Sequence, residues 1–415
     1  MAKILISSLG AGPLDRQNAS ERDYLKAKYR MNDGREYEEN FIASVLHKHL
    51  EIDSIILIGT VKSMWERVYE VFHQENDSDS KNEEWMKLAE QIEKLDRNSS
   101  LDSLDLTPVE KVLGDRSKCL LIKYGLNEAE LQENLDRILN IVDDLQEGDE
   151  LYIDITHSFR SLSVFLLLVL IFLNDLEQEK KIKIKGVFYG MLDVRSELGY
   201  APVVNLQSLF DLTQWIKGAY SLKNFGNGYL ISQLLKEQGE TKLADDINRL
   251  SEAININYLP TIRQRSSDLN ASLRTRGMSS PFKYLRTILE KFTQQFSRRN
   301  ERESDFQLRL AGWYFENKRY ATGYITLTEA IITYVCELNG KDIRFRDDRY
   351  EMKDLLFQEH YNTELARIFR QVNQIRKGIA HASLDEEIPN YTDAIERAKE
   401  YHQQAKTIFK KGTFR

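Results

Sequence analysis

Short apolar segments alternate with helix-like segments through the first half of this chain, and that alternation narrows the choice of fold most. The apolar segments are Lys3–Leu9, Ile52–Gly59, Cys119–Tyr124, Leu151–Thr156 and Ile182–Tyr189. Apolar residues recur at helical spacing in the segments Phe41–Leu50, Leu131–Leu145 and Phe159–Asn174. Strands that alternate with helices need crossover connections, which favour a mostly parallel sheet covered by helices. We therefore predict an α/β, Rossmann-like N-terminal domain.

The rest of the chain has a different character. A polar stretch at about 74–118 interrupts the alternation and is interpreted as an insertion, with an amphipathic segment around Trp85–Leu95. The segment Pro202–Ile216 is expected to lead out of the sheet, and the chain beyond it reads as all-α. A chain of 415 residues exceeds one ordinary core. We expect an α/β domain at 1–207, a helical connecting region at 208–300 and a helical domain at 301–415.

Composition excludes several classes of protein. The net charge of −7 argues against non-specific coating of duplex DNA, which requires a large positive excess. Two cysteines, Cys119 and Cys336, cannot form a disulfide scaffold or a paired-cysteine metal site. The longest apolar run, Val164–Leu173, is far shorter than the roughly 20 residues of a membrane span, and the N-terminus lacks a secretory signal pattern. These features predict a cytoplasmic protein without membrane contact.

Small and polar residues follow the predicted strands. In a parallel sheet these positions gather at one edge, where ligands bind. They include two glycines, Gly10 and Gly12, several hydroxyl residues and Arg160, which suit close approach to phosphate. The GxGxxG and GxxxxGK[ST] motifs are both absent. The pattern indicates a nucleotide pocket of another kind, with the alternative that Thr60, Thr156 and Ser158 only cap helices and His157 is structural.

Four motifs carry a resemblance to a known family: LISSLGAG at 5–12, LIGTVKSMWE at 57–66, DITHSFRSL at 154–162 and FYGM at 188–191. Together they resemble a CRISPR-associated Rossmann-fold (CARF) sensor domain. The nearest likeness is to the type III ribonucleases in which a CARF domain precedes a HEPN nuclease domain. The resemblance implies a homodimeric receptor for cyclic oligoadenylate, with cyclic tetra-adenylate expected before cyclic hexa-adenylate. The implied ligand contacts are Gly10, Thr60, Ser63, Met64, Thr156, His157, Ser158, Arg160 and Met191.

The segment QVNQIRKGIAHASL at 371–384 contains Arg376 and His381 with four residues between them. Following the helical hairpin expected at Trp313–Asn339, it resembles the R-x4–6-H motif of HEPN ribonucleases, although the residue after the arginine is Lys377. Histidine can exchange protons near neutral pH, and arginine can stabilise a developing phosphorane, so neither step needs a metal. Five positions on a helix correspond to about 140° of rotation, so the two side chains do not share one face. Either Gly378 loosens the helix, or two protomers build one composite site, as the resemblance implies.

The segment from Arg263 to Arg309 holds eleven basic and five acidic residues, and the aromatic residues Phe282, Tyr284, Phe292 and Phe296 are interleaved with them. This pattern fits a groove for single-stranded RNA, and the alternative is a solvated helix face whose aromatics belong to the core.

We thus expect a metal-free, cyclic oligoadenylate-activated endoribonuclease for antiviral defence, without a cofactor, in which Arg376 and His381 are catalytic. Two alternatives stay open. One is a non-catalytic sensor whose helical part binds RNA or a partner protein. In that case Arg376 forms a surface ion pair and His381 caps the end of its helix. The other is a CARF domain that also degrades its own activator.

Overall fold

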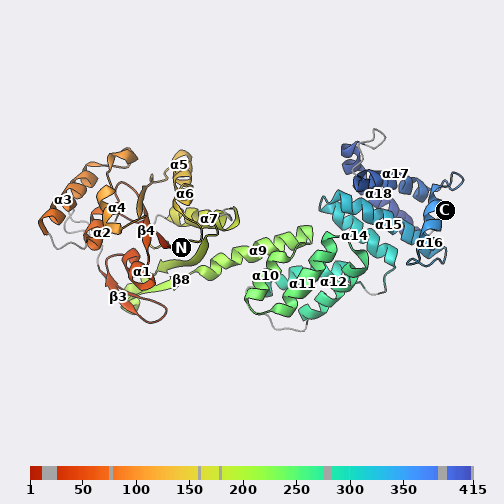
Figure 1. Cartoon of the computed structure of the whole chain (residues 1–415), viewed down its shortest axis with the longest axis horizontal. Coiled ribbons are helices and arrows are strands. Elements are labelled where there is room, and N and C mark those ends of the chain that lie inside the picture. Colours follow the sequence, from red (N-terminus) through yellow and green to blue (C-terminus); the bar gives the residue numbers. More distant parts are fainter. Residues whose placement is uncertain are drawn as a thin grey trace. The chain divides into compact units, whose positions relative to one another are not determined.

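The computed structural model describes residues 1–11, 26–73, 78–157, 160–176, 180–274, 282–298, 300–381 and 390–412. It divides into two compact parts, shown with their elements in Figure 1. The sheet unit comprises Met1–Thr213, and the helical unit comprises Gln214–Arg415. Each is described here by itself.

Five parallel strands form the centre of the sheet unit, in the order β7-β6-β1-β4-β5. Their bounds are β1 Lys3–Leu9, β4 Ser54–Gly59, β5 Lys118–Leu121, β6 Glu150–Asp154 and β7 Lys183–Gly190. All five predicted strands are present, with ends displaced by up to three residues. The parallel Rossmann-like sheet expected from the alternating pattern is confirmed.

Both faces of this central sheet are buried under helices. Successive residues of a strand point to opposite faces and so enter two different cores. In β1, Leu5 and Leu9 pack into one core, while Ile4 and Ile6 pack into the other. The first core is covered by four helices, α1 Ile42–Leu50, α2 Trp65–Phe72, α3 Ser78–Lys94 and α4 Thr107–Leu113. The second core is covered by α5 Glu128–Leu139, α6 Ile141–Asp144 and α7 Arg160–Leu176. Burial on both sides explains why these strands are almost continuously apolar.

Three further strands extend the sheet beyond β7 and were not predicted. They are β8 Ala201–Asn205, β2 Ala27–Arg30 and β3 Glu36–Glu39, and two of their pairings, β7 with β8 and β2 with β3, are antiparallel. The expectation that the chain leaves the sheet at Pro202 is therefore wrong, because the chain first forms β8 and leaves the sheet after Asn205. Pro202 occupies the second position of β8, and its carbonyl accepts a hydrogen bond from the Met191 amide at 2.9 Å. Proline fits there because only its missing amide would be lost from the ladder.

The insertion between β4 and β5 packs onto the sheet unit. Helix α3 contains the amphipathic segment expected around Trp85, and Leu88 and Ile92 enter the first core. The Lys62 ammonium, from the loop after β4, donates to the carbonyls of Ile92 (2.6 Å) and Glu93 (3.0 Å). A cation on the last carbonyls of a helix satisfies acceptors that lack helical partners. The insertion is thereby attached to one of the predicted ligand loops.

The helical unit contains only helices in its described residues, as expected for this part of the chain. From the end of α9 Gln207–Phe225 they continue as α10 Tyr229–Glu237, α11 Thr241–Asn255, α12 Leu259–Arg274, α13 Phe282–Phe296, α14 Glu303–Glu316, α15 Tyr320–Leu338, α16 Arg346–Phe357, α17 Glu364–His381 and α18 Tyr391–Lys411. Helix α14 contributes to two cores, with Leu310 and Trp313 in one and Leu308 and Phe315 in the other. The expected hairpin is formed by α14 and α15 and begins ten residues earlier than Trp313, at Glu303.

Candidate functional site

The loops after β1, β4, β6 and β7 lie at one edge of the sheet. Among the five central strands, β4 and β5 follow β1 on one side, and the next strand along the chain, β6, lies on the other side of β1. Such a reversal leaves a crevice beyond the strand ends, where α/β proteins bind ligands. The Met64 amide donates to the Gly10 carbonyl at 3.1 Å, and the Gly190 amide donates to the Thr156 hydroxyl at 2.8 Å. The structure therefore joins the predicted loops in two pairs around this crevice.

A fully buried carboxylate, Asp154 at the end of β6, organises the second pair of loops. Its Oδ2 accepts from the Ser7 hydroxyl at 2.6 Å, and its Oδ1 accepts from the Thr156 amide at 2.9 Å and the Thr156 hydroxyl at 2.5 Å. Burial raises the pKa of Asp154 to about 6, although these three hydrogen bonds act in the opposite direction. The Thr156 hydroxyl uses its one proton here and accepts from Gly190, so it shapes the loop. Sequence analysis missed Ser7 and Asp154; a carboxylate in the apolar strand LYIDIT was the available signal.

The loop after β4 is held together by its own polar groups. The Ser63 hydroxyl donates to the Leu9 carbonyl at 2.7 Å and accepts from the Thr60 amide at 2.9 Å. The Trp65 indole donates to the Thr60 carbonyl at 2.8 Å. A side chain at Gly59 would lie 2.7 Å from the Trp65 ring, which explains the glycine. Thr60, Ser63 and Met64 are all buried, so their side chains build the loop, and their contact with a ligand stays a prediction.

Four of the predicted contact residues are partly exposed, namely Gly10, Thr156, His157 and Met191. Burial lowers the pKa of His157 to about 4, so its imidazole is neutral at pH 7 and offers one donor and one acceptor. Arg160 begins helix α7, but its side chain is not described. Ser158 lies outside the described residues.

Helix α17 carries the second candidate site at its C-terminal end. His381 is its last residue and is exposed, whereas Arg376 is half-buried. An Nη2 of Arg376 donates to Oδ1 of the buried Asn373 at 3.0 Å, and the Arg376 Nε is buried with no hydrogen-bond partner among the described residues. The helix continues through Gly378 without a break, so the first of the two alternatives, a local loosening of the helix, is not observed. Arg376 and His381 therefore project about 140° apart within one chain. Asn373, one turn before Arg376, was missed.

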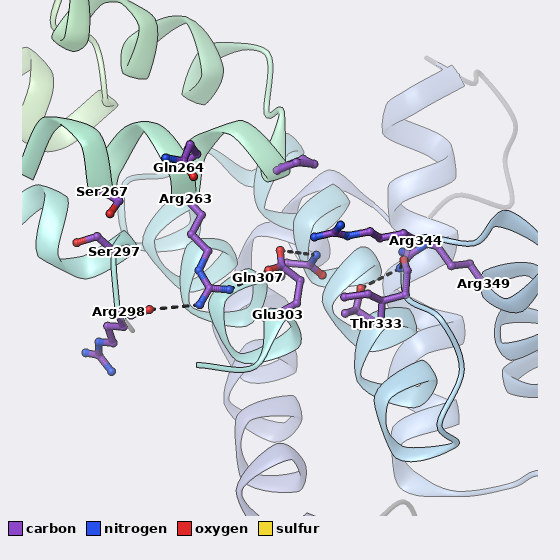
Figure 2. A pocket seen from close by; sticks show the side chains of 12 residues that line it. Arg263, Gln264, Ser267, Ser297, Arg298, Glu303, Gln307, Thr333, Arg344 and Arg349 are labelled. Atoms are coloured by element: carbon purple, nitrogen blue, oxygen red, sulfur yellow. Dashed lines mark hydrogen bonds and ion pairs between the residues drawn. The ribbon is translucent and has the colours of Figure 1, made fainter. Parts of the chain in front are cut away.

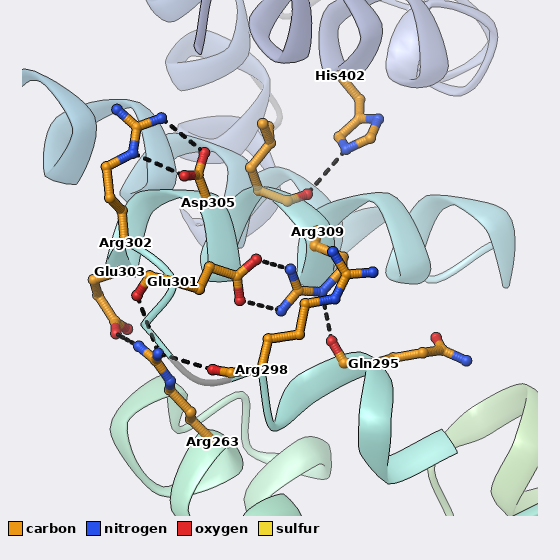
Figure 3. A network of polar contacts seen from close by, with 10 residues as sticks. Arg263, Gln295, Arg298, Glu301, Arg302, Glu303, Asp305, Arg309 and His402 are labelled. Carbon is orange, nitrogen blue, oxygen red and sulfur yellow. Dashed lines mark hydrogen bonds and ion pairs between the residues drawn. The ribbon is translucent and has the colours of Figure 1, made fainter. Parts of the chain in front are cut away.

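The basic segment corresponds largely to the second of the two interpretations offered for it. Phe292 and Phe296 are buried, pack edge-on against Trp313 and belong to the core, so they are not a stacking surface. The side chains of Phe282 and Tyr284 are not described. Many of the arginines form ion pairs, such as Arg302 with Asp305 and Arg309 with Glu301 (Figure 3). The RNA groove predicted from interleaved aromatics is therefore wrong at Phe292 and Phe296.

One part of this segment keeps a concentrated positive charge. Arg298 is exposed and lies beside Arg309 (Figure 3). Burial, followed by the positive charges of Arg298 and Arg263, lowers the pKa of Arg309 to about 10. Arg276 and Arg299 lie outside the described residues.

Comparison with known proteins identifies the family. Residues 4–193 match the family described as "CRISPR system endoribonuclease Csx1, CARF domain". The protein "CRISPR-associated protein MJ1674" of Methanocaldococcus jannaschii is 35% identical over 408 residues. Residues 4–193 are thus a CARF domain of the kind found in CRISPR-associated proteins. The resemblance given by the strand-end motifs is thereby confirmed.

The match between this CARF protein and its M. jannaschii relative covers 92% of the chain and 63% of the relative, so the chain spans under two thirds of that protein. Residues 211–304 match the family described as "CRISPR-associated protein MJ1674, second domain". Among solved structures, Enterococcus italicus Csm6 bound to cyclic hexa-2′-fluoro-hexa-dAMP aligns over 99% of this chain and 95% of that chain, with 13% identity and a TM-score of 0.37. Among the described helices of the CARF protein, none has both the length and the apolar character that crossing a bilayer requires.

Proposed function

We propose that this CARF protein is a cyclic oligoadenylate-activated, metal-independent endoribonuclease that cleaves single-stranded RNA in type III CRISPR antiviral defence. The observation that carries the proposal is the end of α17, where His381 is exposed and Arg376 is fixed by the buried Asn373. The match of residues 4–193 supports both halves of the proposal, because the matched family is described as the CARF domain of an endoribonuclease. The HEPN character of the helical unit belongs to this proposal.

The chemistry needs only these two side chains and the RNA. His381 accepts the proton of a ribose 2′-OH, whose oxygen attacks the adjacent phosphorus and displaces the 5′-oxygen of the next nucleotide. The guanidinium of Arg376 binds a non-bridging oxygen and stabilises the phosphorane as its charge develops. A protonated histidine donates to the leaving 5′-oxygen, so the products end in a 2′,3′-cyclic phosphate and a 5′-hydroxyl.

Two copies of the chain are needed in this scheme. Arg376 and His381 leave the helix in different directions, so a composite site pairs α17 of one protomer with α17 of its partner. Helix α7 of the sheet unit offers a surface for pairing, since Val164, Leu167, Leu168 and Phe172 are between 41% and 58% exposed on one face. A contiguous apolar face of this kind marks an interaction surface. We propose a homodimer joined there.

The messenger is proposed to bind at the crevice between β1 and β6, against the partly exposed Gly10, His157 and Met191. A ring-shaped oligoadenylate suits two such crevices related by a two-fold axis, with cyclic tetra-adenylate the first candidate and cyclic hexa-adenylate the second. Because the Asp154 network links β1, β6 and β7, a ligand bound here contacts a rigid loop pair. Differential binding to two arrangements of the dimer then changes ribonuclease activity.

The decisive experiment compares wild type with His381→Ala in cleavage of labelled single-stranded RNA, with EDTA present, with and without each cyclic oligoadenylate. We expect messenger-dependent cleavage by wild type and a loss of at least about 100-fold in His381→Ala, the scale of a lost general acid or base. The matched control is His360→Ala, an exposed histidine outside α17, which retains wild-type activity.

Messenger binding, measured by calorimetry, is expected to be equal in all three proteins. Full cleavage by His381→Ala would refute the catalytic assignment. Messenger binding without any cleavage by wild type would favour a non-catalytic sensor instead.

A further inference from the structure

A pocket of about 490 Å³ lies inside the helical unit, separate from both sites described above. Side chains from α12 line one side, α14 and α15 line the floor, and the loop before α16 lines the opposite side (Figure 2). Its volume falls within the range of pockets that hold small ligands. Four arginines and a single acidic residue, Glu303, are among its lining residues.

Two of these arginines are fixed and neutralised by the protein. Arg263 forms an ion pair with Glu303 at 3.0 Å and donates to the backbone carbonyls of Arg298 (3.2 Å) and Glu301 (3.1 Å). Arg349 forms an ion pair with Glu329, and it also donates to the Thr333 hydroxyl at 3.0 Å. These contacts form a rigid polar wall, and the charge of each arginine is balanced by the glutamate with which it is paired.

Arg344 differs from them. It reaches into the pocket from the side opposite Arg263 and Ser267 (Figure 2). Its side chain forms no hydrogen bond or ion pair with any residue that the structure describes, and it is exposed. Arg298, the fourth arginine, lies beside Arg309 (Figure 3). Neither Arg298 nor Arg344 has an ion-pair partner among the described residues. The guanidinium of Arg344 reaches into the pocket, and its forked donors match a phosphate group.

A second, independent feature is Gln307 on α14, which lines the same pocket and is 7% exposed. Its amide nitrogen donates to Glu303 at 3.3 Å. Its Oε1 is buried and accepts no hydrogen bond from the described residues. A buried acceptor without a donor is unfavourable, so this oxygen is a binding point for a hydroxyl or amino group.

We propose that this pocket binds one nucleotide, with its phosphate on Arg344 and a ribose hydroxyl or base amino group on Gln307. A nucleotide combines the anion and the donor within the available volume, whereas inorganic phosphate satisfies Arg344 alone. The same chemistry is available in a free mononucleotide and in one unit of an RNA strand. The site is independent of messenger sensing and of cleavage at His381.

The test is equilibrium binding to the full chain of three probes: uridine monophosphate, a uridine oligonucleotide and inorganic phosphate. Uridine probes keep this site distinct from the adenine-specific crevice proposed in the sheet unit. Arg344→Gln is expected to weaken uridine monophosphate binding about tenfold, the value of one charge-assisted contact. The matched control is Arg249→Gln, an exposed arginine on α11 outside the pocket, which binds as wild type does.

Gln307→Met, which keeps the side-chain length, tests the second contact. It is expected to reduce the affinity for uridine monophosphate about fivefold and to leave that for inorganic phosphate unchanged. If only the oligonucleotide depends on Arg344, the pocket holds a unit of an RNA strand; if uridine monophosphate does, it takes free nucleotides. Equal binding of both nucleotide probes by Arg344→Gln and wild type would overturn the proposal, as would an equal loss in Arg249→Gln.

Discussion

The loops of the sheet unit and the end of α17 are built in opposite ways. Around Asp154 and Ser63, each polar group is held by others of the same chain, in networks that join strands distant in sequence. At the end of α17, by contrast, Asn373 is the one hydrogen-bond partner of the Arg376 side chain among the described residues, and His381 is exposed. The proposed ligand site can be prepared within one protomer, whereas the proposed catalytic pair, whose side chains leave the helix about 140° apart, cannot be completed there. On this proposal, the site at the end of α17 depends on dimer assembly, and the loops around Asp154 do not.

The largest expected effect comes from breaking that assembly. In Leu168→Glu/Phe172→Glu, two charges enter the apolar face of α7, and the dimer should be destabilised by about 5 kcal/mol or more, because each buried unpaired charge costs several kcal/mol. Light scattering should report a monomer, and messenger-stimulated RNA cleavage should disappear.

The control for this variant is Leu126→Glu/Leu198→Glu, which places the same charges at two exposed leucines elsewhere in the sheet unit. It should remain dimeric and active. A monomeric α7 variant that still cleaves RNA would show that a single α17 suffices, and the contrast between the two sites would no longer hold.

A smaller effect is expected within the sheet unit itself. Asp154→Ala removes the acceptor of three donors, the buried Ser7 hydroxyl and the part-buried amide and hydroxyl of Thr156. We expect the free energy of unfolding of the sheet unit to fall by about 4 kcal/mol, since each unsatisfied buried group costs about 1–3 kcal/mol. Hydrogen exchange of β1 and β6 amides measures this unit alone.

His381→Ala sharpens the comparison, because removing an exposed side chain should change stability by less than about 0.5 kcal/mol. Asp115→Ala, at an exposed aspartate of the sheet unit, serves as the control within that unit. If Asp154→Ala unfolded no more readily than Asp115→Ala, the loops would owe their order to something other than this network.

The two regions also differ in how far the sequence predicts them. The five central strands were predictable because burial on both faces makes them continuously apolar. Strand β3, with the sequence EYEE, lacks that signal because it is an edge strand. Strand β8 is paired on both sides, but Pro202 and the exposed Asn205 interrupt its apolar pattern.

The sequence predicts where the candidate site residues lie along the chain, but it does not predict which of them are buried or what they contact. The motif indicates that Thr60 and Ser63 follow a strand. Their burial depends also on Leu9, which belongs to the neighbouring strand β1 and accepts a hydrogen bond from Ser63. For the same reason, Phe292 and Phe296 read equally well as an RNA surface and as core; only their packing against Trp313 decides between the two.

The smallest expected effect is a pH dependence that belongs to the sheet unit alone. Burial raises the pKa of Asp154 from 3.8 to about 6, so between these values the folded unit binds a proton that the unfolded chain has released. The stability contributed by Asp154 is therefore fully present below about pH 4 and decreases by about 3 kcal/mol as the pH rises past 6. The lowered pKa of His157 acts in the opposite direction, so the dependence must be measured as a difference between variants. Hydrogen exchange of β1 and β6 amides measures the free energy of unfolding of wild type and Asp154→Asn. Both proteins keep His157, so its contribution cancels in the difference. We expect the stability advantage of wild type over Asp154→Asn to decrease between about pH 4 and pH 6. An advantage that stays constant with pH would mean that Asp154 remains ionised in the folded protein.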